Sequence, residues 1–279
     1  MRISVITPTL NLIESGRRDT FLDAVRSVRA QTHDDIEHLV IDGASTDGTV
    51  ALLEDLEHAG EIAGFRSEKD GGIYEAMNRG AARATGDYLM FLNSDDFYHR
   101  SDGLAEIASA GGADFVCSPV VILTEPPMIH KVSSRFARVL MRMPFNHPGM
   151  AVRRDVFSRM GGFDTQFRIA ADYDLIVRLV AANASSAILE EAFASFRPGG
   201  ISADVDARTN DRVAVLKKNF DTVLEMSQAD WRAALTAERL PRRFLAALLA
   251  APSQCWNMRV IALYHLLRTF RRGRRRKPV

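Results

Sequence analysis

Several features that define special protein classes are absent from this sequence of 279 residues. Its two cysteines, Cys117 and Cys255, are too few for a disulfide framework and lack metal-ligand spacing, which favours a reducing compartment. No window holds the roughly 18 uninterrupted apolar residues of a membrane-spanning helix. The first apolar run is short and ends at Pro8, so no secretory signal is expected. With 47% apolar and 25% charged residues, the composition is that of a globular protein and excludes disorder, collagen and coiled coil.

Two common nucleotide-binding motifs are also missing. No stretch matches the Gly-x-Gly-x-x-Gly fingerprint of dinucleotide-binding domains, and none matches the P-loop pattern. Their absence argues against a dinucleotide dehydrogenase and against a P-loop kinase.

Acidic residues are absent after Glu238, although the whole chain has a net charge of only +1. Residues 239–279 carry a charge of +11, which leaves −10 for the first 238 residues. This asymmetry predicts that the tail, rather than the body, meets a polyanion. Apolar helical stretches precede the basic run without interleaved aromatics, which favours an anionic membrane surface over nucleic acid, and no nucleic-acid partner is expected. A solvated tail is the alternative. We predict a cytoplasmic protein, peripheral at the inner face of the cell membrane.

The first 120 residues alternate between strand-like and helix-like patterns. The expected strands are residues 3–7, 36–41, 62–65, 88–92 and 114–117. The expected helices are residues 20–31, a segment capped by Ser45 or Thr46 and running to residue 56, and residues 73–84 and 104–110. Strands separated by helices predict a mostly parallel sheet in an α/β domain. Ligands bind beyond the carboxyl ends of such strands, so three polar loops should converge there.

The remaining chain has a less regular pattern. We expect a strand at residues 149–152 and helices at residues 155–159 and 172–182. The chain from residue 207 reads as all-helical, with breaks at Pro241 and Pro252. These patterns predict three parts, residues 1–120, residues 121–204 and residues 205–279, of which the last is a helical extension with a basic C-terminal tail.

Asp95 and Asp96 are adjacent carboxylates that follow a buried strand. Hard divalent cations prefer oxygen ligands, and Mg²⁺ usually takes one or two carboxylates together with substrate phosphates. The alternative is a turn in which Asn93 and the aspartates bond to nearby backbone.

Other polar residues could also carry chemistry. Asp42 could accept a hydrogen bond from a nucleobase or ribose, or could simply stabilise a turn. Asp70 and two glycines precede a helix, whose free amides suit an anion. Asp172 opens a helix and could be a general base, although an aspartate in a first helical turn also has a structural reason. His147 is a lone histidine and is more often structural than catalytic.

Five of these motifs, in this order, resemble glycosyltransferase family 2, the inverting enzymes of the GT-A fold. They are residues 6–11, 42–49, 70–80, 93–96 and 161–174, and the resemblance covers residues 2–202. Two departures stand out: Gly43 follows Asp42 where many members have a second acidic residue, and Ala171 precedes Asp172 where an acidic residue is common. The first departure bears on the nucleobase contact.

The resemblance implies a GT-A fold with a C-terminal helical extension, a nucleotide-sugar donor and Mn²⁺ or Mg²⁺. It makes residues 1–120 the nucleotide-sugar-binding half and residues 121–204 the acceptor-binding and catalytic-base half of one GT-A domain. A UDP-sugar is favoured over a GDP- or dTDP-sugar, and the acceptor would be a glycan or lipid-linked molecule. The residues implied for the donor are Thr7, Pro8, Thr9, Asp42, Asp70, Asn78, Arg79 and Asp95; for the metal, Asp96 and Asp95; for the acceptor, His147 and Tyr173; and for the base, Asp172.

This assignment predicts a single displacement that inverts the anomeric centre. The metal stabilises the leaving diphosphate as a Lewis acid, and the base takes the proton of the attacking hydroxyl. Two alternatives remain. One is another nucleotide-sugar enzyme such as a nucleotidyltransferase, and the other is an inactive GT-A binding protein.

Overall fold

The structure is a computed structural model that describes residues 1–133, 136–251 and 255–274. The chain forms two compact units. The first unit comprises Met1–Val132, Phe145–Arg168 and Ser185–Gly200, and the second comprises Ser133–Pro144, Ile169–Ala184 and Ile201–Val279.

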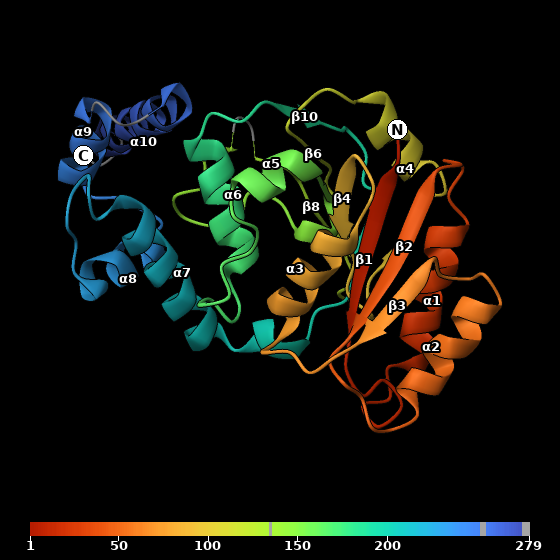
Figure 1. The fold of residues 1–279 in the computed structure, drawn as a ribbon. Helices are drawn as coiled ribbons and strands as arrows, with labels where there is room; N and C mark the ends of the chain where they lie inside the picture. Colours follow the sequence, from red (N-terminus) through yellow and green to blue (C-terminus); the bar gives the residue numbers. More distant parts are fainter. Residues whose placement is uncertain (134–135, 252–254, 275–279) are drawn as a thin grey trace. The chain divides into compact units, whose positions relative to one another are not determined.

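A seven-stranded sheet forms the centre of the first unit (Figure 1). Its strands are β1 (Ile3–Thr9), β2 (Ile36–Asp42), β3 (Gly64–Ser67), β4 (Tyr88–Phe91), β6 (Phe115–Cys117), β9 (Met150–Arg153) and β10 (Ser186–Ile188). They lie in the order β10-β6-β9-β4-β1-β2-β3. Strands β1 to β4 are parallel to one another, whereas β9 is antiparallel to both β4 and β6. The chain order reverses between β1 and β4, which is where open α/β sheets bind ligands.

Helices cover both faces of this sheet because its strands are apolar on both sides. They are α1 (Arg18–Arg29), α2 (Thr49–His58), α3 (Ile73–Arg83), α4 (Gly103–Ser109) and α5 (Arg154–Arg159). Val40 packs with α1 and α2, whereas the neighbouring Ile41 faces α3. Gly80 of α3 lies so close to the sheet that a Cβ atom there would be 2.4 Å from Ile6. Glycine at this position therefore allows α3 to pack closely on β1 and β2.

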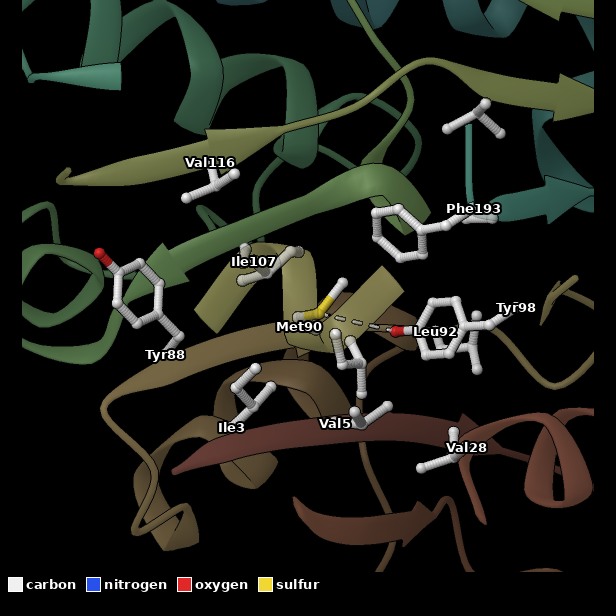
Figure 2. Close-up of a cluster of buried hydrophobic side chains, with 14 of the residues drawn as sticks. Ile3, Val5, Val28, Tyr88, Met90, Leu92, Tyr98, Ile107, Val116 and Phe193 are labelled. Carbon is white, nitrogen blue, oxygen red and sulfur yellow. Dashed lines mark hydrogen bonds between the residues drawn. The ribbon is translucent and has the colours of Figure 1, made fainter. Parts of the chain in front are cut away.

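A second apolar cluster joins the sheet to α1 and α4. Figure 2 shows Ile3, Val5, Val28, Met90 and Ile107 among its members. The Tyr98 hydroxyl donates to Met90 Sδ at 3.9 Å within this cluster. All of these side chains are buried, so the cluster fixes the strand ends that carry the polar loops.

A smaller four-stranded sheet completes the first unit. Its strands are β5 (Phe97–Tyr98), β7 (Val120–Ile122), β8 (Met128–His130) and β11 (Ala194–Phe196), in the order β5-β11-β7-β8. Strands β5 and β11 are antiparallel, with Ser195 opposite Phe97. This register places Arg197, which follows β11, beside the aspartates that precede β5.

The second unit is helical. Its helices are α6 (Ala171–Ala181), α7 (Val205–Phe220), α8 (Gln228–Thr236), α9 (Arg242–Ala250) and α10 (Trp256–Arg274). Trp231, Phe220 and Phe244 stack edge to face in its core, with Trp231 and Phe244 centroids 4.9 Å apart. No helix in the described part of the chain is long and apolar enough to cross a membrane.

The predicted fold class is confirmed: the chain is α/β with a mostly parallel central sheet, flanking helices and C-terminal helices. One local expectation is wrong. Helix α2 begins at Thr49 behind Gly48, with no side-chain cap, instead of at Ser45 or Thr46. The Ser45 hydroxyl donates to Asp42 instead, because the loop folds back on the end of β2. The three-part division at residues 120 and 204 stays a prediction.

Candidate active site

The carboxylate of Asp42 lies at the carboxyl end of β2 and is fully buried. Its Oδ1 accepts hydrogen bonds from Thr9 Oγ1 at 3.1 Å and Ser45 Oγ at 2.5 Å. Its Oδ2 accepts from Ser45 N at 2.8 Å and Ser67 Oγ at 2.7 Å. These four hydrogen bonds connect the ends of β1, β2 and β3 through one carboxylate. Asp42 therefore has a structural role at this edge of the sheet, whether or not it also contacts a ligand.

Thr7 and Pro8 lie within β1, and both are buried. The Thr7 hydroxyl is 3.0 Å from Nε2 of His38 on the neighbouring strand. Burial lowers the pKa of His38 to about 4, so this imidazole is neutral at physiological pH. The residue of β1 that reaches the sheet edge is Thr9, through its bond to Asp42.

Asp70 lies in the loop after β3 and comes close to Gly43. A Cβ atom at Gly43 would be 3.1 Å from Asp70 Oδ2, so this carboxylate occupies the space next to residue 43. Burial raises the pKa of Asp70, and the negative charges of Glu75 and Asp42 add to the effect. The structure therefore brings Asp70, Asp42 and Thr9 together at the ends of β1 to β3, and a larger side chain at position 43 would displace Asp70.

Asn78 and Arg79 on α3 make contacts within the first unit. The Asn78 amide donates to Phe163 O at 2.8 Å and accepts from Phe163 N at 2.9 Å. This pair of bonds fixes the turn at Gly162, where φ is +69°. Arg79 donates to Lys69 O at 2.9 Å and pairs with Glu75 at 2.6 Å. Arg79 thus holds the loop that carries Asp70.

Asp95 and Asp96 follow β4, beside the topological switch between β1 and β4. Asp96 is fully buried; its Oδ1 accepts from Arg197 N at 2.9 Å and its Oδ2 from Asn93 Nδ2 at 3.2 Å. Burial is the main cause that raises the pKa of Asp96 to about 7; the charge of His147 opposes this rise and the negative charge of the adjacent Asp95 adds to it. His147 itself begins a short 3₁₀ helix, His147–Gly149, directly before β9.

The oxygen atoms around Asp96 suit a hard divalent cation. Asn93 Oδ1 is buried beside Asp96 and has no hydrogen-bond partner among the described residues. It adds an amide oxygen to the two carboxylates, and carboxylate and amide oxygens are ligands of Mg²⁺ and Mn²⁺. No cluster of three His, Cys, Asp or Glu side chains that could hold a metal occurs in the described ranges. A cation here would therefore take further ligands from a substrate, as Mg²⁺ usually does.

Arg197 is a site residue that the sequence reasoning missed. Its guanidinium donates to Asp95 O at 2.5 Å, lies 4.8 Å from the centre of the Phe97 ring and is 3.6 Å from Asp23. A positive charge therefore stands next to the two aspartates. Arg197 reaches the aspartates because β11 pairs with the short strand β5. Neither strand was expected from the sequence, so no sequence pattern pointed to Arg197.

Asp172 and Tyr173 belong to the second unit, at the start of α6. Asp172 is 8% exposed, and its Oδ1 accepts from Tyr173 N at 2.8 Å. Tyr173 is buried, and its hydroxyl donates to Val139 O at 2.5 Å. Burial raises the pKa of Tyr173 to about 12, so its hydroxyl stays protonated.

The start of α6 is held by α7. Asp211 Oδ2 accepts from Ile169 N at 2.7 Å and from Ala170 N at 3.3 Å, so a carboxylate of α7 holds the two backbone amides that immediately precede α6. The next residue, Arg212, places its guanidinium 5.4 Å from the centre of the Tyr173 ring. The helical extension therefore supports the backbone next to Asp172, a contribution that no motif in the sequence indicated.

Asp174 forms a buried ionic network in the second unit. Its fully buried carboxylate accepts from Arg178 Nε at 2.7 Å, Lys218 Nζ at 3.1 Å and Asn219 Nδ2 at 3.0 Å. These bonds fasten α6 to α7. No role was assigned to Asp174 from the sequence, whereas its contacts give it a central structural role.

Replacing Asp174 by Asn should lower the free energy of unfolding by about 3 kcal/mol, because Arg178 and Lys218 lose the charge that they share. The matched control is Asp155→Asn. Asp155 also contacts two arginines, Arg153 and Arg159, but is half exposed, so its loss should cost at most about 1 kcal/mol. Urea unfolding of both variants measures the difference, and equal losses would contradict the role given to Asp174.

The mostly parallel sheet carries polar side chains at its carboxyl edge and paired aspartates beside the switch point. This arrangement agrees with the GT-A type of nucleotide-sugar transferase that the sequence motifs resemble.

Comparison with known proteins agrees. Residues 4–161 match glycosyl transferase family 2. A PGL/p-HBAD biosynthesis glycosyltransferase of Mycobacterium bovis is 31% identical over 182 residues, covering 63% of this chain and 68% of that protein. The crystal structure of S. aureus TarS 1-349 in complex with UDP-GlcNAc aligns with a TM-score of 0.60 at 16% identity, over 90% of this chain and 80% of that one.

A second solved structure is the mannosyltransferase PcManGT from Pyrobaculum calidifontis in complex with GDP-Man and Mn²⁺. It aligns with a TM-score of 0.58 at 19% identity, over 95% of this chain and 80% of that one. The chain belongs to glycosyl transferase family 2 and is a glycosyltransferase.

Proposed function

We propose that this glycosyltransferase moves one sugar, with inversion, from a nucleotide-diphosphate-sugar to a hydroxyl of a glycan or lipid-linked acceptor. The observation that carries the proposal is the position of Asp95 and Asp96 in the loop after β4, beside the switch point of the sheet. The carboxylates of Asp42 and Asp70 lie at the ends of neighbouring strands, where a nucleoside would be bound.

In this proposal the first unit binds the donor. The carboxylate of the half-buried Asp70 occupies the space that Gly43 leaves open. From there it offers an acceptor oxygen to the nucleobase. Thr9 and Asp42 hold the strand ends in place, and Arg79 holds the loop of Asp70. Arg197 places a positive charge next to the diphosphate. A UDP-sugar is our first choice, and GDP- or dTDP-sugars are the alternatives. UDP-GlcNAc and GDP-Man are bound in the two solved structures of similar fold.

Asp96 and Asp95 would hold the cation, with Asn93 Oδ1 as a further oxygen. When bound, Mn²⁺ or Mg²⁺ supplies Lewis-acid stabilisation of charge on the leaving diphosphate. The mannosyltransferase relative is shown with Mn²⁺, which supports this assignment.

Asp172 is the proposed general base. It accepts the proton of the acceptor hydroxyl as that oxygen attacks the anomeric carbon, and the bond to the diphosphate oxygen breaks in the same displacement. Asp211 keeps the backbone before Asp172 in place. His147 remains our candidate for binding the acceptor. The hydroxyl of Tyr173 donates to Val139 O and so helps to hold the start of α6 in place.

A ligand screen tests the donor class. The melting temperature should rise with UDP, GDP or dTDP in the presence of Mn²⁺, and less without it, because a ligand that binds only the folded state stabilises it by mass action. The nucleotide that gives the largest shift is then assayed as its sugar conjugate for release of the diphosphate. No shift with any nucleotide would contradict the donor site. A shift without diphosphate release, with acceptor glycans present, would identify a binding protein.

A further inference from the structure

Helix α10 has an apolar side that no other described part of its own unit covers. Trp256, Leu263, Tyr264 and Leu267 are 71%, 49%, 42% and 55% exposed. At 3.6 residues per turn, their spacing places all four on one side of the helix. Single exposed apolar residues are common on proteins, but four on one helical face form a continuous stripe.

The opposite side of α10 is packed into the second unit. Its buried residues are Met258, Ile261, Ala262 and His265, on the side where the helix contacts α9 and α6. His265 also bonds through Nε2 to Ala137 O at 2.7 Å. The helix is therefore anchored in a fixed orientation, and its apolar stripe faces away from the helices that hold it.

The charge of this region determines what the stripe fits. Arg259 and Arg268 lie on α10 itself, and the sequence after Arg268 adds five more arginines and a lysine with no acidic residue. Residues 275–279 of this predicted basic tail lie outside the described residues. A second copy of the chain would bring an equally basic segment to the same place, and like charges would repel. An anionic surface with an apolar interior satisfies both the stripe and the arginines.

We propose that α10 docks in the plane of an anionic phospholipid bilayer. Trp256, Leu263, Tyr264 and Leu267 enter the boundary between headgroups and acyl chains, and the basic residues contact the headgroups. Trp and Tyr are suited to this depth because each combines an apolar ring with a polar atom. The helix lies on the membrane and does not cross it. This docking would hold the enzyme at a surface where lipid-linked molecules reside, but it does not depend on the sugar or on the mechanism.

Vesicle sedimentation with the full chain tests the proposal. The protein should bind phosphatidylglycerol-containing vesicles and bind pure phosphatidylcholine vesicles much less. The triple variant Trp256→Gln/Leu263→Gln/Leu267→Gln should bind at least about tenfold more weakly, because its apolar surface is removed. The control is Met128→Gln/Ile129→Gln on β8, where the side chains are 55% and 56% exposed; it should bind as the unaltered chain does.

Removing residues 273–279 tests the charge separately. Each basic residue near an anionic surface contributes about fivefold in binding, so this truncation should weaken binding by at least about tenfold at low salt and by less at high salt. All variants should keep the melting temperature and the soluble-acceptor turnover of the unaltered chain. Equal vesicle binding by the triple variant and the β8 control would overturn the proposal. So would a dimer in light scattering that the triple variant abolishes, since the stripe would then bind a second copy.

Discussion

Replacing Asp172 by Asn is expected to lower kcat by about 10²–10⁴-fold with little change in donor Kd. Asparagine has nearly the same shape, and its Oδ1 can still accept the hydrogen bond from Tyr173 N that Asp172 accepts. The backbone that leads into α6 keeps its support as well, because Asp211 supplies it. What is lost is the ability to accept a proton, so the chemical step should slow while the protein stays folded.

Asp206→Asn provides the matched control for this variant. Asp206 is also a first-turn aspartate, on α7, but is exposed and pairs only weakly with Arg232 at 3.4 Å. Its replacement should leave kcat and the melting temperature nearly unchanged. A structural role for Asp172 predicts the opposite result: a lower melting temperature with near-normal kcat in the folded fraction. If Asp172→Asn turns over at close to the unaltered rate, another residue is the base.

Asp211 offers a second way to examine the base. Because its carboxylate binds the amides of Ile169 and Ala170, Asp211 acts on the reaction only through the position of Asp172. Its loss should therefore lower kcat more than it changes donor Kd, and Asp211→Asn, which keeps an acceptor oxygen, should retain more activity than Asp211→Ala.

The sheet was predictable because its signals are local. Apolar runs such as those of β1 and β4 are bounded by polar loops, and helical periodicity separates them, so the order of elements followed from residues near one another in sequence. The sheet edge followed as well, since parallel strands end on the same side. Asp42, Asp70, Asp95 and Asp96 could thus be selected without knowing any contact.

The missed features depend on pairing over long distances. Strands β5 and β11 are two and three residues long and separated by about a hundred residues, so neither has a pattern of its own. Their pairing is nevertheless what brings Arg197 to the aspartates. The same is true of Asp211, which binds a backbone amide some forty residues earlier in the chain. Asn78 shows the reverse case: it lies in a recognisable motif, but both polar atoms of its amide bind the backbone of Phe163.

Replacing Asp96 by Asn should abolish sugar transfer and remove the additional thermal stabilisation that Mn²⁺ gives to nucleotide binding. The amide cannot supply a negative ligand, whereas the fold should tolerate the change. The new Oδ1 can accept from Arg197 N, and rotation of the Asn93 amide would present its unpaired Oδ1 to the new NH₂ group. Nucleotide binding without metal should persist, because Asp42 and Asp70 are untouched.

The stability of Asp96→Asn provides an independent readout. Burial raises the pKa of Asp96 from near 3.8 to about 7, so between these values the unfolded chain ionises and the folded chain does not. The free energy of unfolding of the unaltered protein therefore falls, relative to that of the variant, as the pH rises from about 4 to about 7. Above that range the difference between the two free energies stays constant. Urea unfolding in chelator across this range should show Asp96→Asn gaining relative stability with rising pH. A fully active unaltered enzyme in excess chelator, or a variant that still responds to Mn²⁺, would contradict the assignment of Asp96 as the metal ligand.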